Sequence, residues 1–96
     1  MAKESRLQSE VIKYLKHKGC YVIKNTPGAG TPVGCPDIIA LIEGAWLALE
    51  IKSDIESPYQ PLQKATIDKL SDWSLCKMIC PQNWSDIKQE LERFIG

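Results

Sequence analysis

The 96-residue sequence lacks a long hydrophobic run, an excess of charge of either sign, and more than one histidine. Its longest apolar stretches, 38–42 and 45–49, have five residues each, whereas a helix needs about 20 to cross a bilayer. The first residues, Met-Ala-Lys-Glu-Ser-Arg, are polar and do not form a secretory signal. We therefore expect a cytoplasmic protein with no membrane partner.

Twelve basic and twelve acidic residues cancel, which argues against a protein that coats nucleic acid by bulk charge. Neutrality is still compatible with an enzyme that combines a local basic rim with a local acidic metal site. The candidates for such a rim are Lys13, Lys16, Lys18, Lys24 and Lys64, although lysines on helix surfaces usually only interact with solvent.

Four cysteines occur without any Cys-x-x-Cys pair, and His17 is the only histidine. Zinc sites are built from paired cysteines and histidines at short spacings, so this composition gives a zinc site little support. We expect Cys20, Cys35, Cys76 and Cys80 to be reduced thiols that act as small apolar residues.

Hydrophobic periodicity and the positions of glycine and proline predict seven elements. These are a helix at 5–18, strands at 20–24, 37–42 and 45–52, a helix at 61–70, a strand at 74–80 and a helix at 84–95. The order α-β-β-β-α-β-α predicts one α/β domain over residues 1–96, a small mixed sheet flanked by helices. Loop 25–36 lacks a Gly-Lys-Ser/Thr ending, so we expect no nucleotide cofactor.

The most informative pattern is Pro36-Asp37 followed by Glu50-Ile51-Lys52. If Glu43 and Gly44 form a two-residue hairpin turn, then Asp37 pairs with Glu50 across the two strands, with their Cβ atoms roughly 4.5–5.5 Å apart. Directly opposed carboxylates destabilise a sheet, and a divalent cation would compensate. Hard oxygen ligands suit Mg²⁺ or Mn²⁺.

Lys52 follows on the same face, because alternate residues of a strand point the same way. A lysine beside two carboxylates can be a simple ion pair. It also suits phosphodiester hydrolysis, because an ammonium group can orient a water molecule and neutralise charge on a phosphate.

These residues resemble the PD-(D/E)xK nuclease motif, and further features resemble the VRR-NUC (virus-type replication–repair nuclease) domain of that superfamily. The features are Glu10 in the first helix, the loop ending Gly34-Cys35-Pro36-Asp37, the strand Leu49-Glu50-Ile51-Lys52, and Gln63 at the start of the second helix. The resemblance covers about residues 5–80 and implies a restriction-endonuclease-like fold, in a stand-alone form of the kind found in phages.

The resemblance also implies roles for individual residues. Asp37, Glu50, the backbone carbonyl of Ile51 and Glu10 would bind the metal, and Lys52 would be the catalytic lysine. Gln63 would position a phosphate or a water molecule. Glu10 is equally explained as a surface residue of an amphipathic helix, and Gln63 as a polar residue at a helix start; a second glutamine, Gln60, stands nearby.

We therefore expect a Mg²⁺- or Mn²⁺-dependent endonuclease that hydrolyses DNA phosphodiester bonds, with four-way (Holliday) junctions as the candidate substrate. A two-fold junction favours a homodimer with two active sites. The alternative is a non-catalytic DNA-binding or assembly module with the same fold. A metal-dependent RNase or nucleotide hydrolase would use the same chemistry.

Overall fold

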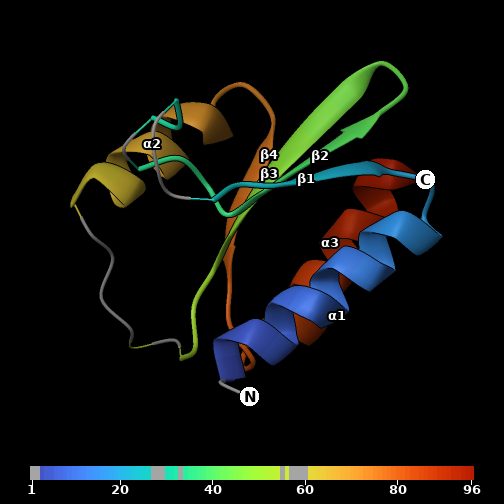
Figure 1. Cartoon of the computed structure of the whole chain (residues 1–96). Coiled ribbons are helices and arrows are strands. Elements are labelled where there is room, and N and C mark those ends of the chain that lie inside the picture. The colour runs from blue at the N-terminus through green and yellow to red at the C-terminus, as the bar shows by residue number, and fades with distance from the viewer. Residues whose placement is uncertain (1–2, 27–29, 33, 55, 57–60) are drawn as a thin grey trace.

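The computed structural model describes residues 3–26, 30–32, 34–54, 56 and 61–96, which form three helices and four strands in the predicted order (Figure 1). The expected α/β fold class is confirmed. The elements are α1 Lys3–His17, β1 Tyr21–Lys24, β2 Ile38–Ile42, β3 Ala45–Ile51, α2 Pro61–Ser71, β4 Leu75–Ile79 and α3 Trp84–Ile95. Within these residues, no helix is long and apolar enough to cross a membrane.

The four strands form one mixed sheet in the order β1-β2-β3-β4. β1 and β2 are antiparallel, and so are β2 and β3, whereas β3 and β4 are parallel. The β3–β4 connection carries α2, as a crossover between parallel strands requires. Helices α1 and α3 lie side by side on one face of the sheet, and α2 lies on the other (Figure 1).

Successive side chains of β3 point to opposite faces of the sheet, so they belong to two different apolar clusters. Leu47, Leu49 and Ile51 belong to the larger cluster, which α1 and α3 cover. Ala48 belongs to the smaller cluster, together with Ile67 of α2. Glu50 has the parity of Ala48, so it points toward α2, and only 2% of its surface is exposed.

The continuous apolar runs 38–42 and 45–49 predict that both faces of β2 and β3 are covered, and this is wrong for the α2 side of β2, which is exposed at Leu41. Tyr21 and Leu41 are cross-strand partners, and they are 71% and 41% exposed. Ile23, which shares their face, is 38% exposed. The short α2 packs mainly on β4, so it leaves an apolar surface on the first two strands.

Several predicted boundaries were wrong by one or two residues. Gly19, at a φ of 89°, ends α1, and Cys20 N–H donates to the Leu15 carbonyl at 3.0 Å, so β1 begins at Tyr21 rather than at Cys20. Asp37 lies just before β2, and Lys52 just after β3. Lys52 N–H nevertheless donates to the Ile79 carbonyl at 2.8 Å, which continues the alignment of β3 with β4.

Gly34 fixes the loop before β2 against α2. Its φ is 83°, and a Cβ atom added there would lie 2.7 Å from the Leu62 carbonyl oxygen. Gly30 also has a positive φ, 91°, but a Cβ atom there would meet no described atom within 4 Å. Backbone strain would therefore affect an alanine at either position, whereas a steric clash would affect an alanine only at residue 34.

We predict that Gly34→Ala lowers the free energy of unfolding more than Gly30→Ala does. The strain of a positive φ costs each variant about 1–2 kcal/mol, and the clash with Leu62 adds to the cost only at residue 34. Urea denaturation of the two variants measures the difference. Equal losses would show that the loop does not need this close approach to α2.

Candidate active site

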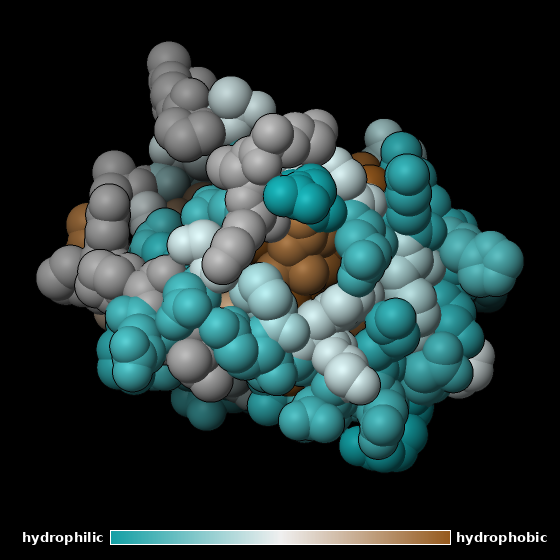
Figure 2. Space-filling model, turned by 90° about the horizontal axis from the view of Figure 1, so that it is seen from below, coloured by the Kyte–Doolittle hydropathy of each residue, from teal (hydrophilic) through white to brown (hydrophobic). Residues whose placement is uncertain are grey.

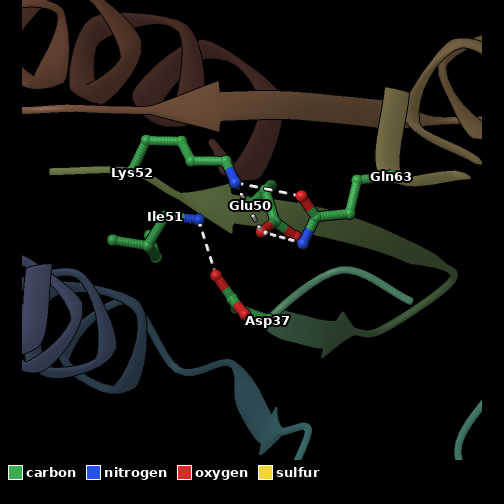
Figure 3. A network of polar contacts seen from close by, with 5 residues as sticks. All are labelled: Asp37, Glu50, Ile51, Lys52 and Gln63. Atoms are coloured by element: carbon green, nitrogen blue, oxygen red, sulfur yellow. Dashed lines mark hydrogen bonds and ion pairs between the residues drawn. The ribbon is translucent and has the colours of Figure 1, made fainter. Parts of the chain in front are cut away.

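The hairpin of β2 and β3 brings Asp37 beside Glu50. The observed pairs run from Ile42–Ala45 to Ile38–Leu49, which is the register that a two-residue turn predicts. Asp37 and Glu50 occupy the next step of that register. The Asp37 carboxylate also reaches the following residue of β3, because Ile51 N–H donates to its Oδ2 at 2.9 Å (Figure 3).

Asn25, just after β1, holds the backbone on which Asp37 sits. Its side-chain Nδ2 donates to the Pro36 carbonyl at 2.7 Å, and its backbone N–H donates to the Asp37 carbonyl at 2.8 Å. Sequence reasoning missed this residue, because an asparagine at the start of a loop rich in glycine and proline is ordinary. Only the pairing of β1 with β2 places it opposite Pro36 and Asp37.

Gln63 of α2 connects Glu50 with Lys52. Its Nε2 donates to Glu50 Oε2 at 2.9 Å, and its Oε1 accepts from Lys52 Nζ at 2.9 Å. Lys52 Nζ lies 3.8 Å from Glu50 Oε2. The amide therefore holds the ammonium group beside the carboxylate (Figure 3), and among the predicted residues Gln63 belongs to this cluster.

One carboxylate oxygen of Glu50 has no hydrogen-bond partner among the residues that the structure describes. This oxygen, Oε1, is buried. A buried acceptor without a partner costs free energy, and Asp37 beside it adds a second carboxylate. Two hard oxygen donors at one position suit a divalent cation such as Mg²⁺ or Mn²⁺.

Within the described residues, no group of three or more acidic, cysteine or histidine side chains could hold a metal ion. Two carboxylates are nevertheless a sufficient protein contribution for Mg²⁺, which usually keeps several water molecules and binds substrate phosphates. The expected ligand role of the Ile51 carbonyl stays a prediction, since the contact observed at Ile51 is through its N–H.

Burial and the neighbouring Asp37 carboxylate raise the pKa of Glu50 from 4.5 to about 7, against the opposing effect of the Lys52 ammonium group. The same surroundings affect two thiols. Burial, Glu50 and Asp37 raise the pKa of Cys35, and burial and Glu50 raise the pKa of Cys76 to about 11. All four cysteines are free, as predicted.

Glu10 lies on the other side of the sheet from Gln63, on the exposed surface of α1. It lines a hollow together with Ser53, which directly follows Lys52. Its catalytic role therefore stays a prediction. Two lysines of the expected basic rim are paired with acids: Lys18 with Glu92 at 3.0 Å, and Lys64 with Asp68 at 3.3 Å.

Comparisons with known proteins bear on the fold and the family of the chain. The family model described as archaeal Holliday junction resolvase (Hjc) matches residues 1–89. A solved structure titled "VRR_NUC domain" has a TM-score of 0.78 and 20% sequence identity, over 98% of this chain and 99% of that chain. The expected VRR-NUC-type fold is confirmed. Among proteins of curated function, none matches the chain.

We predict that Glu50 makes the metal-free protein less stable as the pH rises from about 4.5 to about 7. Its raised pKa means that the folded state holds a proton that the unfolded chain has already lost, so the stabilisation is complete below 4.5 and is lost through about 7. The full shift corresponds to on the order of 3 kcal/mol.

The measurement is the free energy of unfolding in urea between pH 5 and pH 8, with chelator, for the wild type and Glu50→Gln. Because glutamine does not titrate, the difference between the two proteins should change across this window in favour of the variant. A constant difference would contradict the raised pKa.

Proposed function

Because the chain belongs to the archaeal Holliday junction resolvase (Hjc) family, we propose that it is a Mg²⁺- or Mn²⁺-dependent endonuclease that hydrolyses phosphodiester bonds in branched DNA. Four-way junctions are the proposed substrate, and the proposed site consists of Asp37, Glu50 and Lys52 with Gln63. The observation that carries the proposal is the buried Oε1 of Glu50, which lies beside the carboxylate of Asp37 and has no hydrogen-bond partner among the described residues.

The donor set fits a divalent cation held by Asp37 and Glu50. When bound, such a cation lowers the pKa of a coordinated water molecule and neutralises charge on the phosphate. Gln63 donates to Oε2 of Glu50, so Oε1 would be the oxygen that holds the cation. The Ile51 N–H occupies Oδ2 of Asp37 and fixes the rotation of that carboxylate.

Lys52 supplies the positive charge that the protein itself brings to the reaction. Its side chain is only 13% exposed, so its ammonium group acts in a less polar medium than water, where electrostatic stabilisation of the phosphate is stronger. The ammonium group donates to Gln63 Oε1 at 2.9 Å. Gln63 is thus a positioning residue, because it fixes Lys52 and Glu50 and needs no contact with the DNA.

A homodimer is the proposed assembly, because a four-way junction is itself close to two-fold symmetric and two cuts need two active sites. The apolar surface formed by Tyr21, Ile23 and Leu41 supports this proposal. Neighbouring exposed apolar side chains can form part of a protein interface, and these three lie on the α2 face of the sheet, over β1 and β2, which α2 leaves uncovered.

The competing proposal is a DNA-binding module without activity. Lys52 and Gln63 speak against it, since a binding module has no need of an ammonium group held beside two carboxylates. Hydrolysis of RNA would use the same residues as hydrolysis of DNA. The geometry of the site therefore does not distinguish the two activities, and a comparison of the two substrates is needed.

We predict that Asp37→Ala abolishes cleavage of a four-way junction and that Lys52→Ala lowers kcat by about 10²–10³, as loss of a charge-stabilising donor usually does. The assay compares labelled junction, linear duplex, single-stranded DNA and RNA with Mg²⁺, with Mn²⁺ and with chelator. Glu43→Ala is the matched control, because Glu43 is an exposed acidic residue in the turn of the same hairpin.

Full activity of Asp37→Ala would show that cleavage does not take place at the proposed site. Binding of junctions without cleavage in either metal would favour the module without activity. Preferential cleavage of RNA would show that the substrate is RNA and not branched DNA. Circular dichroism of each variant confirms that a loss of activity does not arise from unfolding.

We also predict that Tyr21→Arg with Ile23→Lys shifts the protein from dimer to monomer, because burial of two charged side chains at an apolar interface is costly. Sedimentation equilibrium measures the shift. Trp73→Arg is the control, because Trp73 is 65% exposed and lies after α2, outside the β1–β2 patch. A monomeric wild type that makes paired cuts in a junction would contradict the symmetry argument.

A further inference from the structure

Asn25 continues the register of β1 with β2 by one step. The last pair of these strands is Lys24 with Ile38, so Asn25 and Asp37 occupy the next step. Glu50 occupies the same step of β3, because the β2–β3 register extended by one residue pairs it with Asp37. An asparagine therefore lies in one row with the two proposed metal ligands.

Asn25 holds both of the peptide units that flank the Cα atom of Asp37. The unit before Asp37 carries the Pro36 carbonyl, which accepts from Asn25 Nδ2 at 2.7 Å. The unit after it carries the Asp37 carbonyl, which accepts from the Asn25 backbone N–H at 2.8 Å. Peptide units are rigid planes, so a change in φ or ψ of Asp37 would turn one of them away from Asn25. The two hydrogen bonds together therefore fix the direction of the Cα–Cβ bond of Asp37.

Pro36 and Ile51 restrict Asp37 further. The proline ring fixes the φ angle of the residue before Asp37, and Pro36 is buried. At the other end of the side chain, Asp37 Oδ2 accepts from the Ile51 N–H at 2.9 Å (Figure 3). Contacts within the protein therefore hold Asp37 from its backbone to its carboxylate.

Burial distinguishes this row from the polar residues of the open surface. Figure 2 looks onto the end of the molecule where α1 begins, and hydrophilic side chains cover most of it around a small apolar area. Exposed side chains of this kind change rotamer rapidly in water. Asn25 and Asp37 are instead half-buried, so hydrogen bonds within the protein determine their orientation.

The simpler explanation is that Asn25 only stabilises the loop that follows β1. Its Nδ2 also donates to Cys35 Sγ at 3.1 Å, and asparagine is common in loops. Thr31 has such a role in the same loop, because its hydroxyl donates to the Thr26 carbonyl at 3.1 Å. The two threonines do not belong to the row that contains Asp37, so Thr31 supplies a matched control.

We propose that Asn25 is a positioning residue, which holds Asp37 in the orientation that binds a divalent cation and thereby sets the cation concentration that the nuclease requires. A ligand that is already ordered loses less conformational entropy when the cation binds. Mg²⁺ in particular demands near-ideal octahedral geometry. Loss of the Asn25 side chain should therefore weaken metal binding and leave the chemical step intact. This inference rests on the nuclease function proposed above.

The first test needs neither metal nor DNA and compares two adjacent backbone amides at the end of β3. The Ile51 amide donates to the carboxylate that Asn25 would position, whereas the Lys52 amide donates to the Ile79 carbonyl of β4. Hydrogen exchange is followed by NMR in the presence of chelator. In Asn25→Ala it should be about tenfold faster at Ile51 and unchanged at Lys52, because local opening affects only the amide whose acceptor is no longer fixed.

Thr31→Ala should leave the exchange of both amides unchanged. Asn25→Asp is a second variant, because it keeps the size of the side chain and lacks the donor to the Pro36 carbonyl. It should accelerate exchange at Ile51 as Asn25→Ala does, and it decides the inference if Asn25→Ala does not fold.

The second test measures metal binding without DNA. Mn²⁺ is titrated into the protein, and the free ion is detected by electron paramagnetic resonance. The dissociation constant should be about tenfold higher for Asn25→Ala than for the wild type, as the loss of a group that orients a metal ligand usually causes. In the cleavage assay, the Mg²⁺ concentration for the half-maximal rate should rise by a similar factor, whereas kcat at saturating Mg²⁺ should stay within about twofold. Thr31→Ala should match the wild type in both measurements.

Three results would each overturn the inference. Equal acceleration of exchange at Ile51 and Lys52 would show a general loss of stability. An unchanged Mn²⁺ affinity would show that the orientation of Asp37 does not limit metal binding. A loss of kcat that excess Mg²⁺ does not restore would place Asn25 in the chemical step. A wild type that binds Mn²⁺ but cuts no substrate would instead reject the proposed function, and the exchange and Mn²⁺ measurements would still decide the inference.

Discussion

The buried carboxylate of Glu50 is the constraint on which the rest of the site depends. A carboxyl group that is 2% exposed and adjacent to Asp37 is unfavourable in the folded protein, as its raised pKa indicates. The neighbouring residues reduce this cost only in part, because Gln63 and Lys52 satisfy Oε2, whereas Oε1 has no partner among the described residues. A bound proton relieves the remaining cost, and the divalent cation that we propose would relieve it in the same way.

The fold keeps this arrangement through register and helix position together. The two-residue turn at Glu43 and Gly44 sets the pairing of β2 with β3, and a shift by one residue would turn Glu50 to the opposite face. The crossover helix α2 then brings Gln63 over the end of β3. The close approach of Gly34 to the Leu62 carbonyl ties the loop before Asp37 to the same helix.

The sequence predicted this centre well, because its main parts follow from local rules. Alternation along a strand and the index sum of a hairpin are sufficient to place Asp37, Glu50 and Lys52 together. Asn25 could not be predicted, since its role depends on how β1 pairs with β2. Nor could the exposure of Tyr21 and Leu41 be foreseen, because it depends on which strands α2 covers. Glu10 belongs to a helix on the opposite face of the sheet, whose distance from the site no periodicity gives.

The sheet separates two sets of polar residues, which come from different parts of the chain. Asp37, Glu50, Lys52 and Gln63 all come from one continuous stretch of 27 residues, from β2 to α2, whereas Arg6, Glu10 and Gln82 come from α1 and the segment before α3. The proposed centre is therefore contained in one hairpin-and-helix segment whose geometry the rest of the fold supports, and the same fold occurs in a solved structure at only 20% sequence identity.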